Sequence, residues 1–140
     1  MNKFVNSMVL LFVTPLLAPL AMADSYFERF SADQINDDVY VIHGPLEYPS
    51  VHNRGFMNNP AFVVAGKGVV VIDPGSTHET GEMLLKQIAK VTDKPVTHVF
   101  NTHVHGDHWL GNDAIVKRFP EVSIIADPRM IKKARAGAGE

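Results

Sequence analysis

Hydrophobic residues fall in short β-branched runs, and turn residues separate the runs from one another. The runs predict five strands, over 39–44, 61–65, 69–73, 96–101 and 122–126. The second and third of these strands are joined by Gly66-Lys67-Gly68, and we expect the two glycines to adopt the positive φ angles of a tight hairpin. A phosphate-binding loop would need Ser or Thr after the lysine and a different glycine spacing, so the hairpin is preferred.

A helix is predicted over 76–91, after the third strand. We expect Ser76 to cap its first turn, with Glu79 three positions on to complete a capping box. Apolar side chains recur on one face of this helix: Leu84, Ile88 and Val91. The periodicity therefore predicts a helix that packs on the sheet through that face.

Two shorter helices are predicted over 114–119 and 127–136. Asp127 is expected to cap the second of them, and Pro128 occupies its first position. Strands alternate with helices from the hairpin onward, which is the pattern of an α/β fold with helices packed on a sheet.

Two segments show no regular pattern. Residues 24–38 are mostly polar, with a few aromatic residues, and are interpreted as a segment that leads into the domain. Residues 45–60 contain three prolines and three asparagines and are predicted to form a long irregular loop. Because long loops often bind ligands, His52 in this loop is a candidate for the border of a substrate groove.

The first 23 residues have the pattern of a secretory leader. Lys3 gives a basic start, residues 8–22 carry no charge, and Ala21-Met22-Ala23 offers the small residues that a signal peptidase requires. We therefore predict a signal peptide over 1–23, a domain over 24–140, and a periplasmic or secreted location.

The apolar run of the leader is too short for a membrane span. A span needs about 20 residues, and Pro15 and Pro19 interrupt this run. No stable membrane anchor is therefore expected after cleavage. The net charge of −2 at pH 7 indicates neither a nucleic acid nor an anionic membrane as partner. The chain has no cysteine, so its exported form must rely on packing or metal in place of disulfides.

The stretch NTHVHGDHWLGN, residues 101–112, concentrates potential metal ligands directly after a predicted strand. Its donors are His103, His105, Asp107 and His108. Zinc accepts imidazole and carboxylate ligands at about 2.0–2.2 Å. Side chains at i and i+2 of an extended segment project to the same side, so His103 and His105 could bind one ion, and Asp107 and His108 suit a second one nearby.

A structural zinc site is the main alternative to a catalytic one at this motif. Structural sites close around the ion with four ligands, often cysteines. The chain has no cysteine, and four donors within six positions do not readily form one tetrahedron. The position after a strand is also where open α/β sheets place their functional sites, so a catalytic type of site is favoured.

Other residues near the motif have open or ordinary roles. Asp73 either orients a ligand histidine or only begins an Asp-Pro-Gly turn. Asn101 and Thr102 are candidates to hydrogen-bond the histidine rings. Trp109 is a candidate for the wall of the site, although a lone tryptophan is more often part of the core. His98 shares a predicted strand face with two apolar residues and is interpreted as a core histidine.

At THVHGDH the chain resembles the metallo-β-lactamase superfamily, whose signature is H-x-H-x-D-H after a strand. The likeness covers roughly residues 39–126, including FVVAGKGVVVIDPG and KPVTHVFNTHVHGDHWLGN. It implies a four-layer αββα sandwich that binds one or two zinc ions. His103 and His105 would bind the first zinc, and Asp107 and His108 the second. Asp107 would also act as the catalytic residue that orients the attacking water and carries its proton, and Asp73 would support the ligands.

The resemblance implies an exported zinc-dependent hydrolase in which metal-bound hydroxide attacks the carbonyl of a small-molecule amide, ester or thioester. Family members take their remaining zinc ligands from the second half of the sandwich, and no histidine follows His108 here. We therefore expect only the N-terminal half of the fold, truncated, with the remaining ligands absent. Two alternatives stay open, namely a catalytically inert fragment and a non-catalytic zinc-binding accessory protein.

Overall fold

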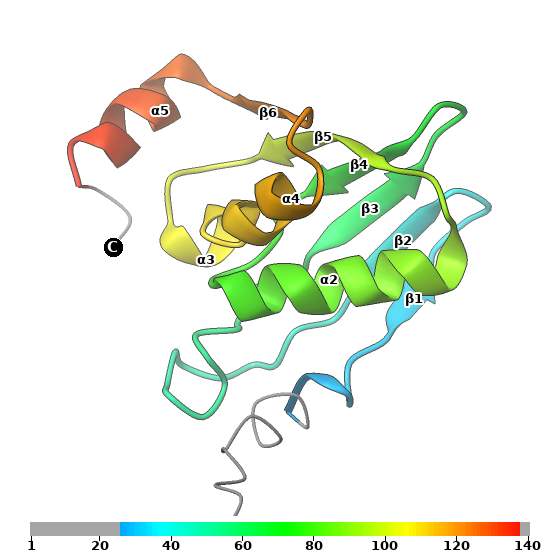
Figure 1. The fold of residues 1–140 in the computed structure, drawn as a ribbon. Coiled ribbons are helices and arrows are strands. Elements are labelled where there is room, and N and C mark those ends of the chain that lie inside the picture. Colours follow the sequence, from blue (N-terminus) through cyan, green and yellow to red (C-terminus); the bar gives the residue numbers. More distant parts are fainter. Residues whose placement is uncertain (1–25, 138–140) are drawn as a thin grey trace, which may run out of the picture.

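The β-branched runs form one mixed sheet in the computed structural model, which describes residues 26–137 (Figure 1). The strands follow one another across the sheet in chain order. They are β1 (Ala32–Gln34), β2 (Val39–Ile42), β3 (Ala61–Val64), β4 (Val69–Ile72), β5 (Val96–Asn101) and β6 (Ser123–Ala126). The helices are α2 (His78–Val91), α3 (Gly106–Trp109), α4 (Asn112–Arg118) and α5 (Pro128–Arg135).

The sheet changes from antiparallel to parallel at β4. Strands β1 to β4 pair antiparallel with their neighbours, whereas β4, β5 and β6 run parallel. Each parallel step needs a crossover connection, which α2 supplies between β4 and β5, and α3 with α4 between β5 and β6. The carboxyl ends of β4 and β5 therefore lie side by side at one edge of the sheet.

The hairpin between β3 and β4 forms as predicted, but the backbone angles of its two glycines differ from the expectation. Neither Gly66 nor Gly68 has a positive φ angle. The turn closes through a hydrogen bond from Ala65 N to Gly68 O of 2.9 Å. A Cβ on Gly68 would lie 2.4 Å from Cγ2 of Thr97 on β5, so close packing explains this glycine better than backbone conformation does.

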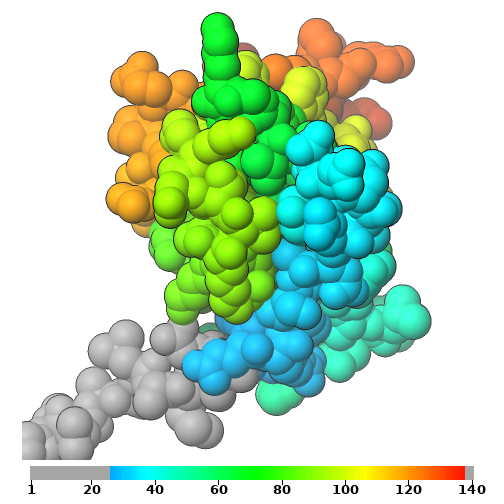
Figure 2. Space-filling model, turned by 90° about the vertical axis from the view of Figure 1, so that its right-hand side faces the viewer, coloured from blue at the N-terminus to red at the C-terminus, as the bar shows by residue number. Residues whose placement is uncertain are grey.

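The core lies between the sheet and α2, whose face carries Leu84 and Ile88 as predicted. Val91 was predicted on that face too, but it is 38% exposed because it is the last residue of the helix. From the sheet, fully buried side chains point toward the helix: Ile42, Phe62, Val69, Val71 and Val99. The space-filling view shows α2 in yellow-green lying against the blue and cyan N-terminal strands (Figure 2).

The leading segment is more structured than its polar composition indicated. It contains β1, which pairs with β2, and it buries Tyr26 and Phe27 in the core. The ring of Phe30 stands edge-on to Phe56, with centroids 4.9 Å apart. These aromatic residues were the available signal, because aromatic side chains carry large apolar surfaces that folding buries.

Helix α2 begins two residues later than the predicted range 76–91, and its cap lies one residue later than Ser76. Thr77 is the N-cap, its side chain accepts from Thr80 N at 3.3 Å, and Thr80 Oγ1 accepts from Thr77 N at 2.9 Å. Ser76 and Glu79 therefore do not form the capping box. Glu79 remains in the first turn, where a hydrogen bond from its own backbone N–H lowers the pKa of its carboxyl.

The two later helices agree closely with the sequence. Helix α4 begins two residues before the predicted segment 114–119. Asp127 caps α5 by accepting from Arg129 N at 2.8 Å, and Pro128 stands at the start of the helix, as predicted. Hydrogen bonds from the Arg129 guanidinium hold the pKa of Asp127 at about 2.

His98 is not a core histidine. A β-bulge pairs Val69 with Val96 but Val70 with His98, so the alternation of faces along β5 shifts by one residue. His98 consequently turns to the face opposite α2, where it is exposed. Phe100 lies on the same face and is 43% exposed.

Helices in the part of the chain between residues 26 and 137 are all too short or too polar to cross a membrane. The predicted signal peptide and its cleavage position lie outside the described residues.

Gly81 lets α2 approach α4 closely, and we expect Gly81→Ala to destabilise the protein. A Cβ there would lie 2.5 Å from Gly111 O and 2.8 Å from Ala114 Cβ. Overpacking of this kind typically costs about 1–3 kcal/mol, which exceeds the gain of about 1 kcal/mol from the better helix propensity of alanine. Urea unfolding of the full chain measures the difference.

The control is Gly66→Ala, because no atom lies within 4 Å of a Cβ at that position and its φ is not positive. We expect this variant to keep the stability of the wild type. A Gly81→Ala protein as stable as the wild type would show that the helices have room to separate.

Candidate metal centre

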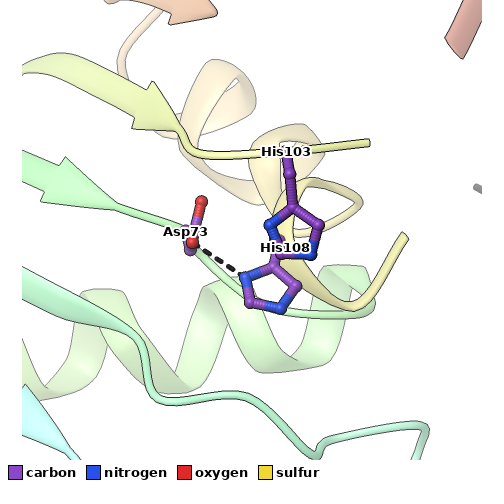
Figure 3. A group of neighbouring side chains, drawn as sticks. All are labelled: Asp73, His103 and His108. Carbon is purple, nitrogen blue, oxygen red and sulfur yellow. Dashed lines mark hydrogen bonds and ion pairs between the residues drawn. The ribbon is translucent and has the colours of Figure 1, made fainter. Parts of the chain in front are cut away.

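The candidate site lies where β4 and β5 end side by side (Figure 3). Asp73 directly follows β4, and the histidine-rich stretch directly follows β5. The single turn of α3 then reverses the backbone, with His108 N donating to His105 O at 3.0 Å. The turn brings the His108 ring back to Asp73, although 35 residues separate the two in sequence.

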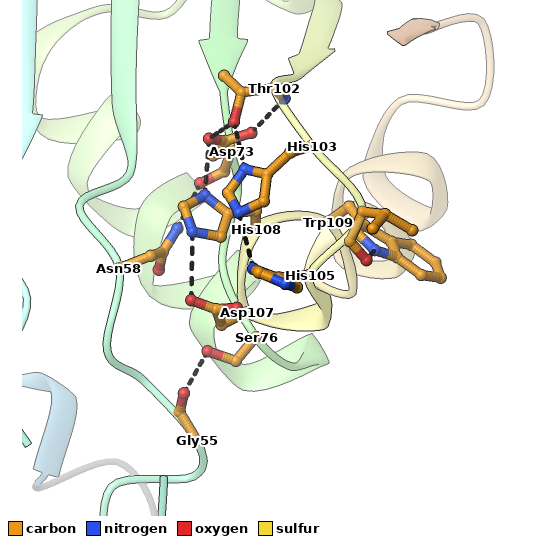
Figure 4. Close-up of polar contacts among 11 residues, drawn as sticks. Gly55, Asn58, Asp73, Ser76, Thr102, His103, His105, Asp107, His108 and Trp109 are labelled. Carbon is orange, nitrogen blue, oxygen red and sulfur yellow. Dashed lines mark hydrogen bonds and ion pairs between the residues drawn. The ribbon is translucent and has the colours of Figure 1, made fainter. Parts of the chain in front are cut away.

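Asp73 is buried, and its carboxylate contacts other residues of the site. Its Oδ1 accepts from Thr102 N at 2.8 Å, and its Oδ2 accepts from Thr102 Oγ1 at 2.6 Å (Figure 4). Oδ2 also lies 2.8 Å from Nδ1 of His108. Asp73 is therefore placed to orient a histidine, which was one of the two roles considered for it. It also begins the Asp-Pro-Gly turn, which was the other role.

His103 and His105 present two ring nitrogens to one another. The distance between His103 Nε2 and His105 Nδ1 is 3.1 Å. Two nitrogens bound at about 2.0–2.1 Å to a tetrahedral zinc lie roughly 3.3 Å apart, so the pair has a separation suited to one ion. The other nitrogen of His103, Nδ1, lies 3.0 Å from Thr102 Oγ1, which fixes the ring from behind.

Asp107 and His108 form a second pair of the same kind. Asp107 Oδ2 lies 3.2 Å from His108 Nε2, again a distance suited to two ligands of one ion. The rear nitrogen of His108 is the one that contacts Asp73, so both candidate pairs contain a histidine supported on its far side. The rings of His103 and His108 have centroids 4.0 Å apart, which places the two pairs beside each other.

The three donor side chains that lie close enough together to share one ion, among the described residues, are not the set that the sequence motif names. They are Asp73, His103 and His108, whose donor atoms all lie within 4.8 Å of one another. His105 and Asp107 each contact one of these histidines. Because both oxygens of Asp73 already accept hydrogen bonds, we assign Asp73 to support and keep His103, His105, Asp107 and His108 as the candidate ligands.

The two other predicted neighbours of the rings behave differently from each other. Thr102 contacts the His103 ring through its Oγ1, 3.0 Å from Nδ1. Asn101 is buried, but its Oδ1 has no hydrogen-bond partner among the described residues, and it does not hydrogen-bond a ring. Trp109 is half-buried and donates from Nε1 to Val104 O at 2.8 Å, so it braces the ligand loop rather than joining the core.

A groove of about 400 Å³ adjoins the donor cluster. Its apolar wall comes from Pro49, Met57 and Leu110, and its polar lining includes Ser76, His105 and Asp107. The predicted long loop therefore does border the candidate site. His52 is not among the groove residues, because its ring packs edge-on against Tyr26 with centroids 5.0 Å apart.

Buried polar contacts hold this loop in place. Asn53 accepts from Ser50 N at 2.8 Å and from Gly55 N at 2.9 Å, and it donates to Tyr48 O at 2.9 Å. Ser76 Oγ donates to Gly55 O at 2.5 Å, which ties the loop to the turn before α2. Sequence reasoning identified the loop but not these contacts. The partners of Asn53 lie within the loop, whereas Ser76 binds Gly55 across 21 residues of sequence.

The sheet, the crossover helices and the donor cluster after β5 define an α/β protein with a metal-binding type of site. Residues 53–137 match the metallo-beta-lactamase superfamily, and the chain belongs to that family. The resemblance carried by the histidine motif is thereby confirmed.

Solved structures support the same assignment of the fold. A metallo-beta-lactamase from Pontibacter korlensis superimposes with a TM-score of 0.62 and 26% sequence identity, over 79% of this chain and 50% of that one. A metallo beta lactamase from Erythrobacter litoralis gives a TM-score of 0.60 at 24% identity, over 76% of this chain and 45% of that one. The expected partial αββα fold is therefore confirmed.

Curated relatives are hydrolases and match over shorter stretches. A hydroxyacylglutathione hydrolase from Nostoc sp. is 39% identical over 54 residues, which cover 39% of this chain and 19% of the relative. A linear primary-alkylsulfatase from Pseudomonas sp. is 32% identical over 73 residues, which cover 49% of this chain and 14% of the relative. The chain thus matches less than a fifth of the length of either relative and about half the length of the similar structures.

Proposed function

We propose that this chain carries the zinc-binding half of an exported hydrolase that acts on an amide, ester or thioester of a small molecule. The observation that carries the proposal is the paired geometry of the donors, 3.1 Å between the nitrogens of His103 and His105 and 3.2 Å between Asp107 and His108. Ligand-like spacing in two adjacent pairs is characteristic of a centre for one or two ions.

This donor set suits zinc better than magnesium or calcium, which prefer oxygen ligands. The donors are three imidazoles and one carboxylate, which zinc accepts, and the chain contains no thiolate. A zinc ion usually takes four ligands, so two ions would need donors in addition to these four. When bound, zinc lowers the pKa of a water ligand and polarises a carbonyl oxygen of the substrate.

The chain's own residues have distinct tasks in this proposal. Asp107 belongs to the donor cluster and also lines the groove, so it can orient the attacking water and carry its proton through a carboxylate oxygen. The apolar wall formed by Pro49, Met57 and Leu110 receives an uncharged part of the substrate and excludes water from it.

The names of the relatives extend the range of substrates to be tested. One relative is a hydroxyacylglutathione hydrolase, which favours including an acylated glutathione, and another is an alkylsulfatase. The predicted leader supports a periplasmic or secreted location. The slightly acidic chain gives no reason to expect a nucleic acid as partner.

Hydrolysis by the zinc-loaded parent hydrolase, of which this chain is proposed to be the zinc-binding half, tests the proposal. The substrates are a chromogenic β-lactam, a nitrophenyl ester and an acylated glutathione, with a chelator-treated sample as reference. We expect turnover of at least one substrate that stops on chelation, and a fall of about 10²–10⁴-fold in kcat for Asp107→Asn, which cannot accept the proton.

Three other outcomes would contradict a catalytic role. Zinc binding without turnover of any substrate would favour the accessory-protein alternative. The absence of both zinc binding and turnover would favour the inert fragment. Turnover that Asp107→Asn leaves unchanged would remove Asp107 from the reaction.

A further inference from the structure

Asp73 supports the candidate site from an unusual backbone conformation. Its φ angle is +51°, in the left-handed region that residues with side chains seldom adopt. Pro74 follows it, and a residue before proline is restricted further. Conformations of this kind persist only where the surroundings hold them, and they gather at functional sites.

Two hydrogen bonds hold the backbone of Asp73. Its N–H donates to Phe100 O at 3.0 Å, which continues the pairing of β4 with β5. Its carbonyl oxygen accepts from Nδ2 of Asn58 at 3.0 Å, and this contact comes from the far side of the site, at the end of the long loop (Figure 4). The first bond fixes the peptide before Asp73, and the second fixes the peptide after it.

Asn58 is an unfavourable residue to bury for packing alone. It is 4% exposed, and its Oδ1 has no hydrogen-bond partner in the described part of the chain. A buried carbonyl without a partner lowers the free energy of unfolding, a penalty that an apolar residue at this position would not carry. The bond to Asp73 is the contact that an apolar residue could not replace.

We propose that Asn58 is a positioning residue for His108. By holding the carbonyl of Asp73, it fixes the backbone conformation from which the Asp73 carboxylate reaches both Thr102 and His108 Nδ1. A carboxylate only accepts, and the His108 ring lies between two of them, with Asp73 Oδ2 2.8 Å from Nδ1 and Asp107 Oδ2 3.2 Å from Nε2. The shorter contact, to the more buried Asp73, favours the single proton of the neutral ring on Nδ1 and leaves the lone pair on Nε2. The role in metal binding rests on the proposed function, whereas the effect on the His108 tautomer does not.

The dependence of the His108 tautomer on Asn58 can be tested by NMR. The experiment measures the nitrogen chemical shifts of the histidine rings at pH 8, in the ¹⁵N-labelled, metal-free full chain. In the wild type we expect His108 as a single tautomer protonated at Nδ1. Asn58→Ala should give a mixture of the two tautomers. Asn58→Leu keeps the branched shape without a donor or a charge and should do the same, which keeps the test open if the alanine variant does not fold.

The matched control is Asn59→Ala. Asn59 is the adjacent asparagine. Its Oδ1 accepts from Gly44 N at 2.9 Å, and among the described residues it makes no hydrogen bond to Asp73. We expect this variant to keep the wild-type tautomer, because the same loop is loosened while the Asp73 carbonyl stays held.

Zinc titration of the same proteins separates this inference from the proposed function. We expect the two Asn58 variants to bind zinc about 10–100-fold more weakly, the usual cost of losing support for a ligand. If the wild type binds no zinc but its His108 tautomer still depends on Asn58, the positioning role stands and the proposed function fails. If the tautomer is the same in wild type and both Asn58 variants, the positioning role is wrong.

Discussion

Replacing His103 by alanine is expected to lower the zinc affinity of the full chain by more than about 100-fold. His103 and His105 hold their nitrogens 3.1 Å apart, and a single remaining imidazole cannot replace the pair. Loss of a direct ligand should cost more than the 10–100-fold that loss of a supporting partner typically costs. Isothermal titration with zinc at constant pH measures the change.

His98→Ala is the matched control for this variant, because His98 is an exposed histidine on the neighbouring β5 and faces away from α2. We expect its zinc affinity to equal that of the wild type. Equal loss of affinity in both variants would mean that zinc is held by scattered surface histidines and not by a built centre.

Asp73→Ala is expected to have the second large effect, on stability as well as on metal binding. The substitution removes the acceptor of three contacts, from Thr102 N, Thr102 Oγ1 and His108 Nδ1, at a buried position. Hydrogen bonds to ionised groups contribute about 1.5–3 kcal/mol each but are not additive, so we expect a loss of roughly 2–5 kcal/mol. Urea unfolding without metal measures it.

Asp73→Asn separates the orienting role from the structural one. The amide keeps the shape of the carboxylate and one acceptor oxygen for Thr102, but it turns an N–H donor toward one of the former partners. We expect a smaller loss of stability than with alanine and a fall of about 10–100-fold in zinc affinity. Full zinc affinity in Asp73→Asn would show that His108 needs no support from this side chain.

Strands with strong β-branched runs could be predicted from the sequence, and β5 has the bounds that the pattern indicates. Short β1 could not, because its residues Ala-Asp-Gln carry no strand signal and its place depends on pairing with β2. The exposure of His98 could not be predicted either, since the bulge beside it exists only in the pairing of two strands.

The four candidate ligands could be identified from their spacing in the sequence. In the structure His103 lies beside His105 and Asp107 lies beside His108. Their assignment as ligands is still a prediction. The roles of Ser76 and Asn58 were not visible in the sequence, because each acts on a partner at least 15 residues away that only folding brings near.

X-ray absorption spectroscopy of the zinc-loaded full chain tests the central claim most directly, namely that the residues after β5 form a metal centre. We predict nitrogen and oxygen ligands at about 2.0–2.1 Å with the outer-shell scattering of at least two imidazole rings, and loss of imidazole scattering in His103→Ala. A spectrum of hydrated zinc without imidazole scattering, from a protein that is folded, would contradict the account.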